Sequence, residues 1–397
     1  MNLDYRYILL LASILILLSI LASRFAARLG VSSLLATLCI GIVLGNGGVY
    51  DFNYDFPETT LHISEVALCF IIFSGGFNSN WKGLRPVVGK GLSLASIGVL
   101  CTSLVMGLVV YLLFDWPFLA ALLLGAIVSS TDAAAVFSIL ESTGLKLKCN
   151  LGEILELESG TNDPMAYFLT ISFSYLLVQP EAGILQLGMS FILSMSVGLL
   201  TGILGGRLAN FMVYKSKLKK GQTPVLLVSL ILLLYSINSL LGGSPFLSVY
   251  VAGLLISQSF WKNKPISIFF FEGVSWLMET TLFLILGLQV YLSEIMNVFW
   301  EGLLLSLVLI VLARPTGVFV SMSLFKDMNW RLKTFLSWVG LRGATPIVFA
   351  LVPLVDQVPV AEEIFNISFI IVITSILVQG TTVRQFAQLT RCNQNSV

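Results

Sequence analysis

Residues 158–164 read ESGTNDP, a polar stretch that is followed directly by the apolar segment Met165–Val178. Two of its side chains, Glu158 and Asp163, are acidic. A third acid, Asp132, lies in the preceding apolar segment within the sequence SSTDA. Ionised side chains are costly at the centre of a bilayer, so carboxylates there usually belong to an ion or proton pathway. Buried acids on consecutive apolar segments therefore suggest a transporter.

The composition indicates that the chain is built for a membrane. Hydrophobic residues make up 57% of the sequence and charged residues 11%, and the mean hydropathy is +0.94. A soluble domain carries about 25% charged residues, so too few are present here to cover a water-facing surface. The net charge of +1 argues against a nucleic-acid partner, which requires a basic face. The five cysteines show no Cys-x-x-Cys pairing, so we interpret them as small apolar residues and not as disulfides or metal ligands.

Apolar runs of about 20 residues predict an all-α, multi-pass membrane protein with about thirteen transmembrane helices. The second, third and ninth runs are short enough that one of them could be re-entrant. We expect residues 1–385 to form a single transmembrane domain, followed by a short cytoplasmic tail at 386–397. The predicted spans are 7–22, 31–45, 62–76, 89–113, 117–140, 152–178, 183–206, 222–240, 244–259, 274–291, 298–324, 333–354 and 362–383.

Charge in the loops supports this count independently. Lys and Arg collect in every second loop, from Arg24 and Arg28 to Arg384 and Arg391, whereas the intervening loops carry acids such as Asp115. Basic residues concentrate on the cytoplasmic side of short loops. We therefore expect the amino terminus outside and the carboxyl terminus in the cytoplasm, in a cell membrane of the bacterial inner-membrane type.

The charged residues within the predicted spans lie at similar depths. At a rise of 1.5 Å per residue, Asp132 is about 22 Å and Asp163 about 17 Å from the ends at which their helices enter the membrane. Both depths are near the middle of a bilayer about 30–40 Å thick. Arg314 is also near the midplane, and Arg342 is somewhat nearer the cytoplasm. Because each buried ion requires a partner, we expect these residues and Glu158 to form one cluster.

Asp163 is the predicted exchanging group. Its ionised carboxylate offers hard oxygen ligands to a monovalent cation, and its protonation releases that cation, so competition at one carboxylate couples the two fluxes. Thr131, Asp132, Ser159 and Asn162 can add hydroxyl, carboxylate, amide or backbone oxygens. The alternative for Asp132 is a helix cap or a satisfied buried acid.

Glu158 and Asn162 are four residues apart, so they share one face of a helix. The simplest role for Glu158 is an ion pair with Arg314, which would hold two parts of the site together. Arg342 is the alternative partner for Glu158.

Two predicted spans are interrupted by polar residues or glycine. Span 117–140 contains SSTD at 129–132, and span 333–354 contains GLRGATP at 340–346. If the first six and last six spans are inverted repeats, these two spans correspond. Broken helices in corresponding positions of two halves point to a transporter site, with Arg342 and Gly343 supporting the break. An ordinary kink is the alternative, since glycine is common in membrane helices.

These motifs resemble those of the monovalent cation:proton antiporter-1 family, of NhaP and NHE type, over essentially the whole chain. The motifs are TD at 131–132, ESGTND at 158–163, ARP at 313–315 and GLRGA at 340–344. The resemblance implies thirteen helices in two inverted repeats, at about 7–178 and 222–383. It also implies a core domain of crossed discontinuous helices, a dimerisation domain, a homodimer and elevator-type alternating access.

The resemblance further implies an antiporter that exchanges Na⁺ or K⁺, with Li⁺ as a further candidate, for H⁺, without a cofactor. In that family the aspartate at the position of Asp163 binds the ion, and the asparagine before it accompanies electroneutral one-for-one exchange. The arginine at the position of Arg314 pairs with the glutamate at that of Glu158. Two residues depart from the pattern: Ala133 replaces a frequent proline, and Ser74 replaces an aspartate that is common in the potassium-handling branch.

Two other kinds of protein use buried acids. A cation/H⁺ symporter or channel could use the same carboxylates. An intramembrane aspartyl protease requires Gly-x-Gly-Asp, whereas Asp163 follows Gly-Thr-Asn. We therefore expect a transporter and not an enzyme.

Overall fold

The computed structural model describes residues 13–22, 33–48, 54–132, 147–181, 183–215, 219–261 and 264–393, together with positions 6, 10 and 136. Within these ranges the chain is helical, and the one β-type contact is an isolated bridge between Leu147 and Asn393. The predicted all-α class is confirmed. Most of 133–146 lies outside the described ranges. The same holds for several basic loop residues that were used to predict the topology, namely Arg24, Arg28, Lys146, Lys217 and Lys262.

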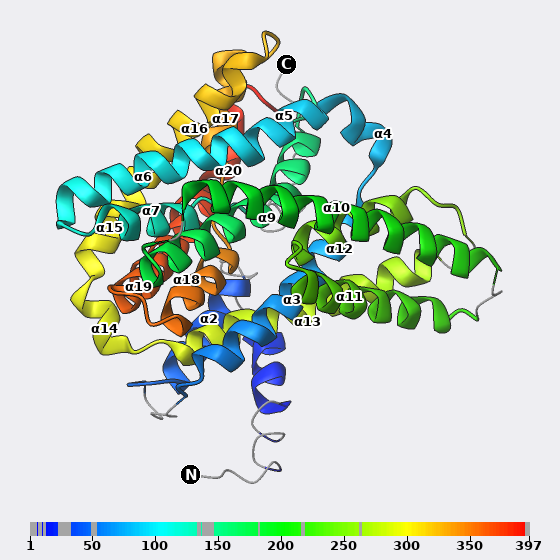
Figure 1. Cartoon of the computed structure of the whole chain (residues 1–397), viewed down its shortest axis with the longest axis horizontal. Helices are drawn as coiled ribbons and strands as arrows, with labels where there is room; N and C mark the ends of the chain where they lie inside the picture. The colour runs from blue at the N-terminus through cyan, green and yellow to red at the C-terminus, as the bar shows by residue number, and fades with distance from the viewer. Residues whose placement is uncertain are drawn as a thin grey trace.

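The helices differ widely in length (Figure 1). They are α2 Ser33–Leu44, α3 Pro57–Asn78, α4 Trp81–Leu84, α5 Val88–Ser93, α6 Val99–Phe114, α7 Phe118–Ile127, α9 Leu151–Val178, α10 Ile184–Lys215, α11 Gln222–Leu241, α12 Pro245–Ser257, α13 Lys264–Gln289, α14 Leu292–Asn297, α15 Phe299–Val308, α16 Arg314–Ser321, α17 Trp330–Trp338, α18 Thr345–Val355, α19 Ala361–Ser375 and α20 Thr381–Leu389. Short 3₁₀ turns occupy Arg85–Val87 and Met322–Leu324, and π-turns occupy Leu94–Gly98, Leu309–Ala313 and Ile376–Gly380.

Seven of the described helices are long and apolar enough to cross a membrane, among them the continuous helices Trp81–Phe114, Phe299–Leu324 and Ala361–Leu389. Five shorter apolar helices accompany them: Ser13–Ala22, α2, α7, α12 and α18. The chain is thus a multi-pass membrane protein. The exact number of thirteen spans stays a prediction.

The helices form two bundles that meet at α9 and α18 on one side and α3 and α12 on the other. We call α2, α3 and α10–α13 the support bundle, and α4–α7, α9 and α15–α20 the crossing bundle. Figure 1 shows α10–α12 on one side of the molecule and α6, α7, α15, α18 and α19 on the other. Glycine allows close helix contact within the support bundle: a Cβ at Gly76 of α3 would lie 2.6 Å from the carbonyl oxygen of Tyr250 in α12.

Two helices are interrupted and cross each other at the interruption. α7 ends at Ile127, and 130–132 are not helical; α17 ends at Trp338, and α18 starts only at Thr345. The two non-helical segments touch, because the Asp132 N–H donates to the Leu341 carbonyl at 2.8 Å. The predicted crossed discontinuous helices are therefore confirmed.

The sequence places the start of three spans too late; one is the fourth, which is predicted to begin at 89 although the continuous helix begins at Trp81. The third predicted span begins at 62, but α3 begins at Pro57 and is 22 residues long, so it is not short. The tenth begins at 274, but α13 begins at Lys264. An apolar-run criterion misses these two starts because α3 opens with polar residues, and because Glu272 interrupts the apolar residues near the start of α13. At α3, proline in the first turn and the acidic Glu58 favour a helix start. α2 and α12 are short, as predicted.

Candidate functional site

Arg342 holds the crossing together. It is 1% exposed, and its Nη1 donates to the carbonyl oxygens of Ser129, at 2.6 Å, and Ser130. Its backbone N–H donates to the Ser375 hydroxyl at 3.0 Å. The break just after α7 leaves carbonyls without helical partners, and a cation at a helix C-terminus also offsets the negative end of the helix dipole. Arg342 thus stabilises the break that the sequence predicts, and its side chain bonds to the backbone and not to Glu158.

Gly343 lets the two broken segments approach each other. A Cβ at this position would lie 1.9 Å from Oδ2 of Asp132. Any side chain at Gly343 would therefore displace the Asp132 carboxyl group from the crossing. This is a steric requirement for glycine at the position next to Arg342.

Asp163 faces the crossing from α9 and is 5% exposed. Ser130 donates its hydroxyl proton to Oδ1 of Asp163 at 2.5 Å. In the same way Asn162 Nδ2 donates to the Thr131 hydroxyl at 2.5 Å, and the Ser159 hydroxyl donates to the Thr131 carbonyl at 3.1 Å. One helical turn of α9 is therefore attached to the first broken segment by three hydrogen bonds.

A proline distinguishes α9 from an ordinary spanning helix. Pro164 lies inside the helix, directly after Asp163. Proline has no N–H to donate, so the carbonyl four residues earlier, that of Gly160, loses its helical partner. This leaves an additional oxygen one turn from Asp163, on a residue that lines the cavity described below.

Glu158 and Arg314 form an ion pair in which both groups are buried, at 1% and 2% exposure. Two parallel hydrogen bonds join them, Nη1 to Oε1 at 2.5 Å and Nη2 to Oε2 at 3.0 Å. Arg314 Nη2 also donates to the Leu336 carbonyl at 3.3 Å. The pair thus connects α9 and α16 to the last turn of α17, one turn from Asp163 along α9.

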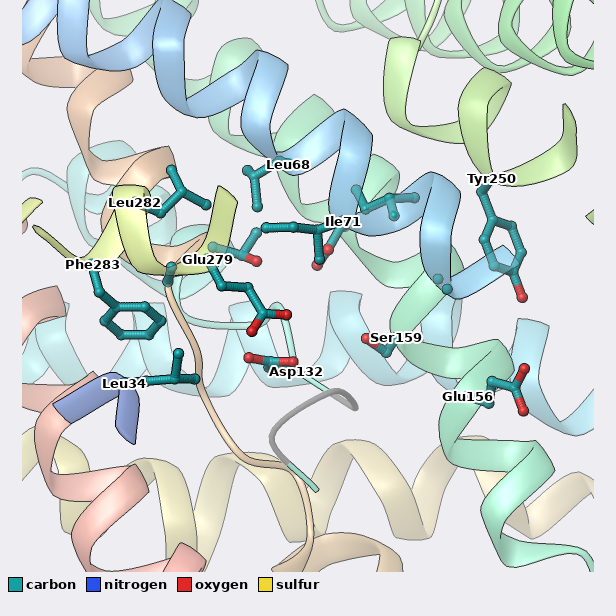
Figure 2. Close-up of a pocket in the computed structure, with 16 residues that line it drawn as sticks. Leu34, Leu68, Ile71, Asp132, Glu156, Ser159, Tyr250, Glu279, Leu282 and Phe283 are labelled. Carbon is teal, nitrogen blue, oxygen red and sulfur yellow. The ribbon is translucent and has the colours of Figure 1, made fainter. Parts of the chain in front are cut away.

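The site opens onto a cavity of about 140 Å³ between the two bundles (Figure 2). Asp132, Ser159 and Asp163 line it, whereas Asn162, Thr131 and the Glu158–Arg314 pair lie behind them. The support bundle completes the wall. The remaining lining residues are Leu34, Leu68, Ile71, Ile72, Gly75, Glu156, Gly160, Tyr250, Glu279, Leu282, Phe283, Ala344 and Thr345.

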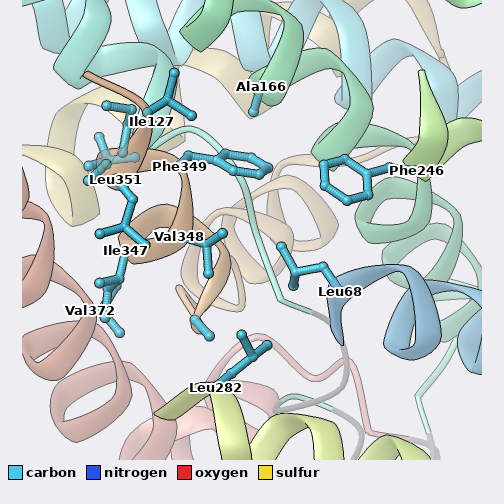
Figure 3. Close-up of a cluster of buried hydrophobic side chains, with 14 of the residues drawn as sticks. Leu68, Ile127, Ala166, Phe246, Leu282, Ile347, Val348, Phe349, Leu351 and Val372 are labelled. Atoms are coloured by element: carbon cyan, nitrogen blue, oxygen red, sulfur yellow. The ribbon is translucent and has the colours of Figure 1, made fainter. Parts of the chain in front are cut away.

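The cavity continues along α9 in one direction only. Glu156, Ser159 and Asp163 line it, but Ala166, one turn further along α9, is fully buried. There Figure 3 shows Ala166 beside a cluster of apolar side chains that includes Phe246 and Phe349. The Tyr167 ring packs on both phenylalanines, with ring centroids 4.9 and 5.2 Å apart. Asp163 is therefore accessible from the Glu156 end and closed off at the Tyr167 end.

Sequence reasoning missed two acids of the cavity, Glu156 and Glu279. Glu279 carries the same signal that identified Asp132, because it lies about 22 Å along a long membrane helix by the same rise per residue. Placing the start of α13 too late concealed this depth. Glu156 accepts a hydrogen bond from Ser79 at the end of α3, which joins α9 to the support bundle. Ser130, the hydroxyl partner of Asp163, was also not assigned a role.

The fold and this site define a class of protein. A multi-pass membrane protein in which two discontinuous helices cross beside buried carboxylates has the architecture of a secondary transporter.

Comparison with known proteins identifies the family. The family model described as "Sodium/hydrogen exchanger, transmembrane" matches residues 13–389, and the chain belongs to this family. It is 37% identical to the K(+)/H(+) antiporter NhaP2 of Shewanella sp. (strain ANA-3) over 96% of this chain and 67% of that protein. It is 35% identical to the K(+)/H(+) antiporter NhaP of Alkalimonas amylolytica over 96% of this chain and 66% of that protein. The chain thus spans about two thirds of the length of these relatives.

Two further matches have lower sequence identity. The Na(+)/H(+) antiporter NhaG of Bacillus atrophaeus is 28% identical over 75% of this chain and 58% of that protein. The solved structure of the sodium proton antiporter MjNhaP1 from Methanocaldococcus jannaschii superposes with a TM-score of 0.84, at 20% identity, over 95% of this chain and 96% of that one. This superposition shows a shared fold.

Proposed function

We propose that the protein is an antiporter that exchanges a monovalent cation for H⁺, with both ions competing for Asp163. The observation that carries the proposal is the position of Asp163: a carboxylate on a broken-helix crossing, buried within the protein yet lining a cavity. The ionised carboxylate binds a cation, and the protonated carboxyl group releases it. Because the K(+)/H(+) antiporters NhaP2 and NhaP are more similar to this chain than NhaG is, K⁺ is the first cation to test, followed by Na⁺ and Li⁺.

The remaining site residues divide into ligands and supports. Ser130, Ser159, Asp132 and the Gly160 carbonyl supply oxygens next to Asp163, and Asn162 and Thr131 orient the same turn of α9. Glu158 and Arg314 position α9 against α16. Arg342 binds the carbonyls at the helix break, and Gly343 leaves room for the Asp132 carboxyl group at the crossing. No cofactor is needed, because the carboxylate itself carries either ion.

The division into two bundles supports alternating access. We propose that the crossing bundle carries the site relative to the support bundle, in an elevator-type movement, within a single domain over 1–385 built from repeats at about 7–178 and 222–383. Asn162, in place of a second acid, supports electroneutral one-for-one exchange. We further propose a homodimer in the cell membrane, with the amino terminus outside, so that the Glu156 end of the cavity faces the cytoplasm.

The test is cation-driven proton movement in everted membrane vesicles that contain a pH-sensitive dye. After acidification, K⁺ or Na⁺ should release the stored protons in wild type, with and without an imposed voltage. Asp163→Asn should abolish this release, while the protein is still inserted and folded. Full activity of Asp163→Asn would exclude Asp163 from the mechanism. Cation and proton movement in the same direction would indicate a symporter.

A further inference from the structure

The support bundle presents one acidic side chain, Glu279 of α13, to the cavity beside Asp163. Figure 2 shows the Glu279 carboxyl group pointing toward Asp132, and the two acidic groups interact electrostatically. Among the described residues, none forms a hydrogen bond or an ion pair with Glu279 in this structure. By contrast, Asp163 accepts a hydrogen bond from Ser130, and Glu156 accepts one from Ser79.

The surroundings of Glu279 offer no positive charge. None of the described residues that line the cavity is basic. The two arginines of the site are already engaged, Arg314 with Glu158 and Arg342 with backbone carbonyls. Glu279 is half-buried. A carboxylate that lines such a cavity is stabilised by a proton or a cation, because an unpaired charge withdrawn from water is costly. The cavity of about 140 Å³ has room for an ion and several waters.

The carboxylates that line the cavity also belong to two different bundles. Asp132 and Asp163 belong to the crossing bundle, whereas Glu279 belongs to the support bundle. If the crossing bundle moves, as the proposed function requires, the two sets of carboxylates separate. A contact of Glu279 with the transported cation would then exist only while the cavity has its present form.

We propose that Glu279 is a cation ligand on the support bundle that acts together with Asp163 and Asp132 in this state only. This proposal rests on the proposed antiport. It assigns Glu279 a role in capturing the cation from the side to which the Glu156 end of the cavity opens, and in releasing it when the crossing bundle moves. Glu279 therefore contributes to the apparent affinity at one face of the membrane and not at the other.

The experiment compares Glu279→Gln with wild type in everted and right-side-out vesicles, using K⁺ and Na⁺ as probes. The KM for the cation should rise about tenfold when the cation is added at the cytoplasmic face, and change less than about twofold at the other face. The maximal rate should stay within about threefold of wild type. Glu272→Gln is the matched control, because Glu272 lies on the same helix, is exposed and does not line this cavity; it should leave both KM values unchanged.

Each other outcome has a definite meaning. An unchanged KM at the cytoplasmic face, or an equal rise at both faces, overturns the proposal for Glu279. A fall in maximal rate alone would show a structural role and would also overturn it. If Glu279→Gln does not fold, Glu279→Asp keeps the charge but shortens the side chain, and the same rise in KM at one face is expected. Failure of the proposed antiport is distinguishable, because wild type itself would then show no exchange.

Discussion

At the scale of single residues, the site shows how charges are kept in a membrane protein. Glu158 and Arg314 neutralise each other through two hydrogen bonds, and Arg342 binds carbonyls that the helix break leaves free. Among the described residues, no arginine or lysine pairs with Asp163, which accepts a hydrogen bond from the Ser130 hydroxyl. In the described part of the chain, the carboxylate proposed to exchange ions is therefore not neutralised directly by a protein cation. This difference separates a transport group from structural ion pairs.

The Glu158–Arg314 pair leads to a stability prediction. Arg314→Ala leaves Glu158 buried without its cation, and breaking a buried pair in this way costs about 3–5 kcal/mol. We expect a large fall in the thermal unfolding midpoint in detergent, and a partial recovery when Glu158→Gln is added. Arg207→Ala, at an exposed position, is the control. An unchanged midpoint in Arg314→Ala would contradict the structural role of the pair.

At the scale of elements, side-chain hydrogen bonds between α9 and α3 connect the two bundles. The Tyr167 hydroxyl of α9 donates to Oε1 of Glu65 in α3, and the Tyr235 hydroxyl of α11 donates to the other oxygen at 2.7 Å. The first bond crosses between the bundles, whereas the second lies within the support bundle. Together with the Ser79–Glu156 bond, the Tyr167–Glu65 bond ties the bundles on either side of Asp163 along α9.

These two tyrosines offer a matched pair of variants for the elevator-type movement. Tyr167→Phe and Tyr235→Phe each remove one hydrogen bond to Glu65, with a similar loss of about 1 kcal/mol of stability. If the bundles move relative to each other, only Tyr167→Phe should change the exchange rate, because only that bond must break in each cycle. The measurement is the maximal rate of dye recovery in vesicles for both variants. Equal effects of the two variants would argue against movement at this contact.

At the scale of the whole molecule, competition at one carboxylate fixes the sign of the pH dependence. Protons occupy Asp163 increasingly as the pH falls, and a ligand must be deprotonated to bind a cation. The KM for K⁺ or Na⁺ should therefore rise as the pH falls, approaching tenfold per pH unit well below the pKa of the site. Measuring KM from about pH 6 to pH 9 checks this. A KM that stays constant over this interval would exclude competition.

Much of the molecule could be predicted from the sequence because its causes are local. Long apolar runs, the breaks at 129–132 and 340–346, and acids in apolar segments are all readable along the chain. They determined the helical membrane class and indicated the residues of the crossing. The starts of α3 and α13 are predicted too late for a local reason as well, because polar or charged residues near these starts interrupt the apolar sequence.

Only the tertiary structure decided which of these residues meet. Three contacts depend on helices that are far apart in the sequence. Arg314 pairs with Glu158, and Arg342 binds the carbonyls of Ser129 and Ser130. Glu279 lies opposite Asp132. Residue spacing specifies the face and depth of a side chain on its own helix, but not the rotation and offset of the helix packed against it. The sequence by itself therefore determined what kind of charges lie in the membrane, and helix packing decided which of them are neutralised and which remain available to bind an ion.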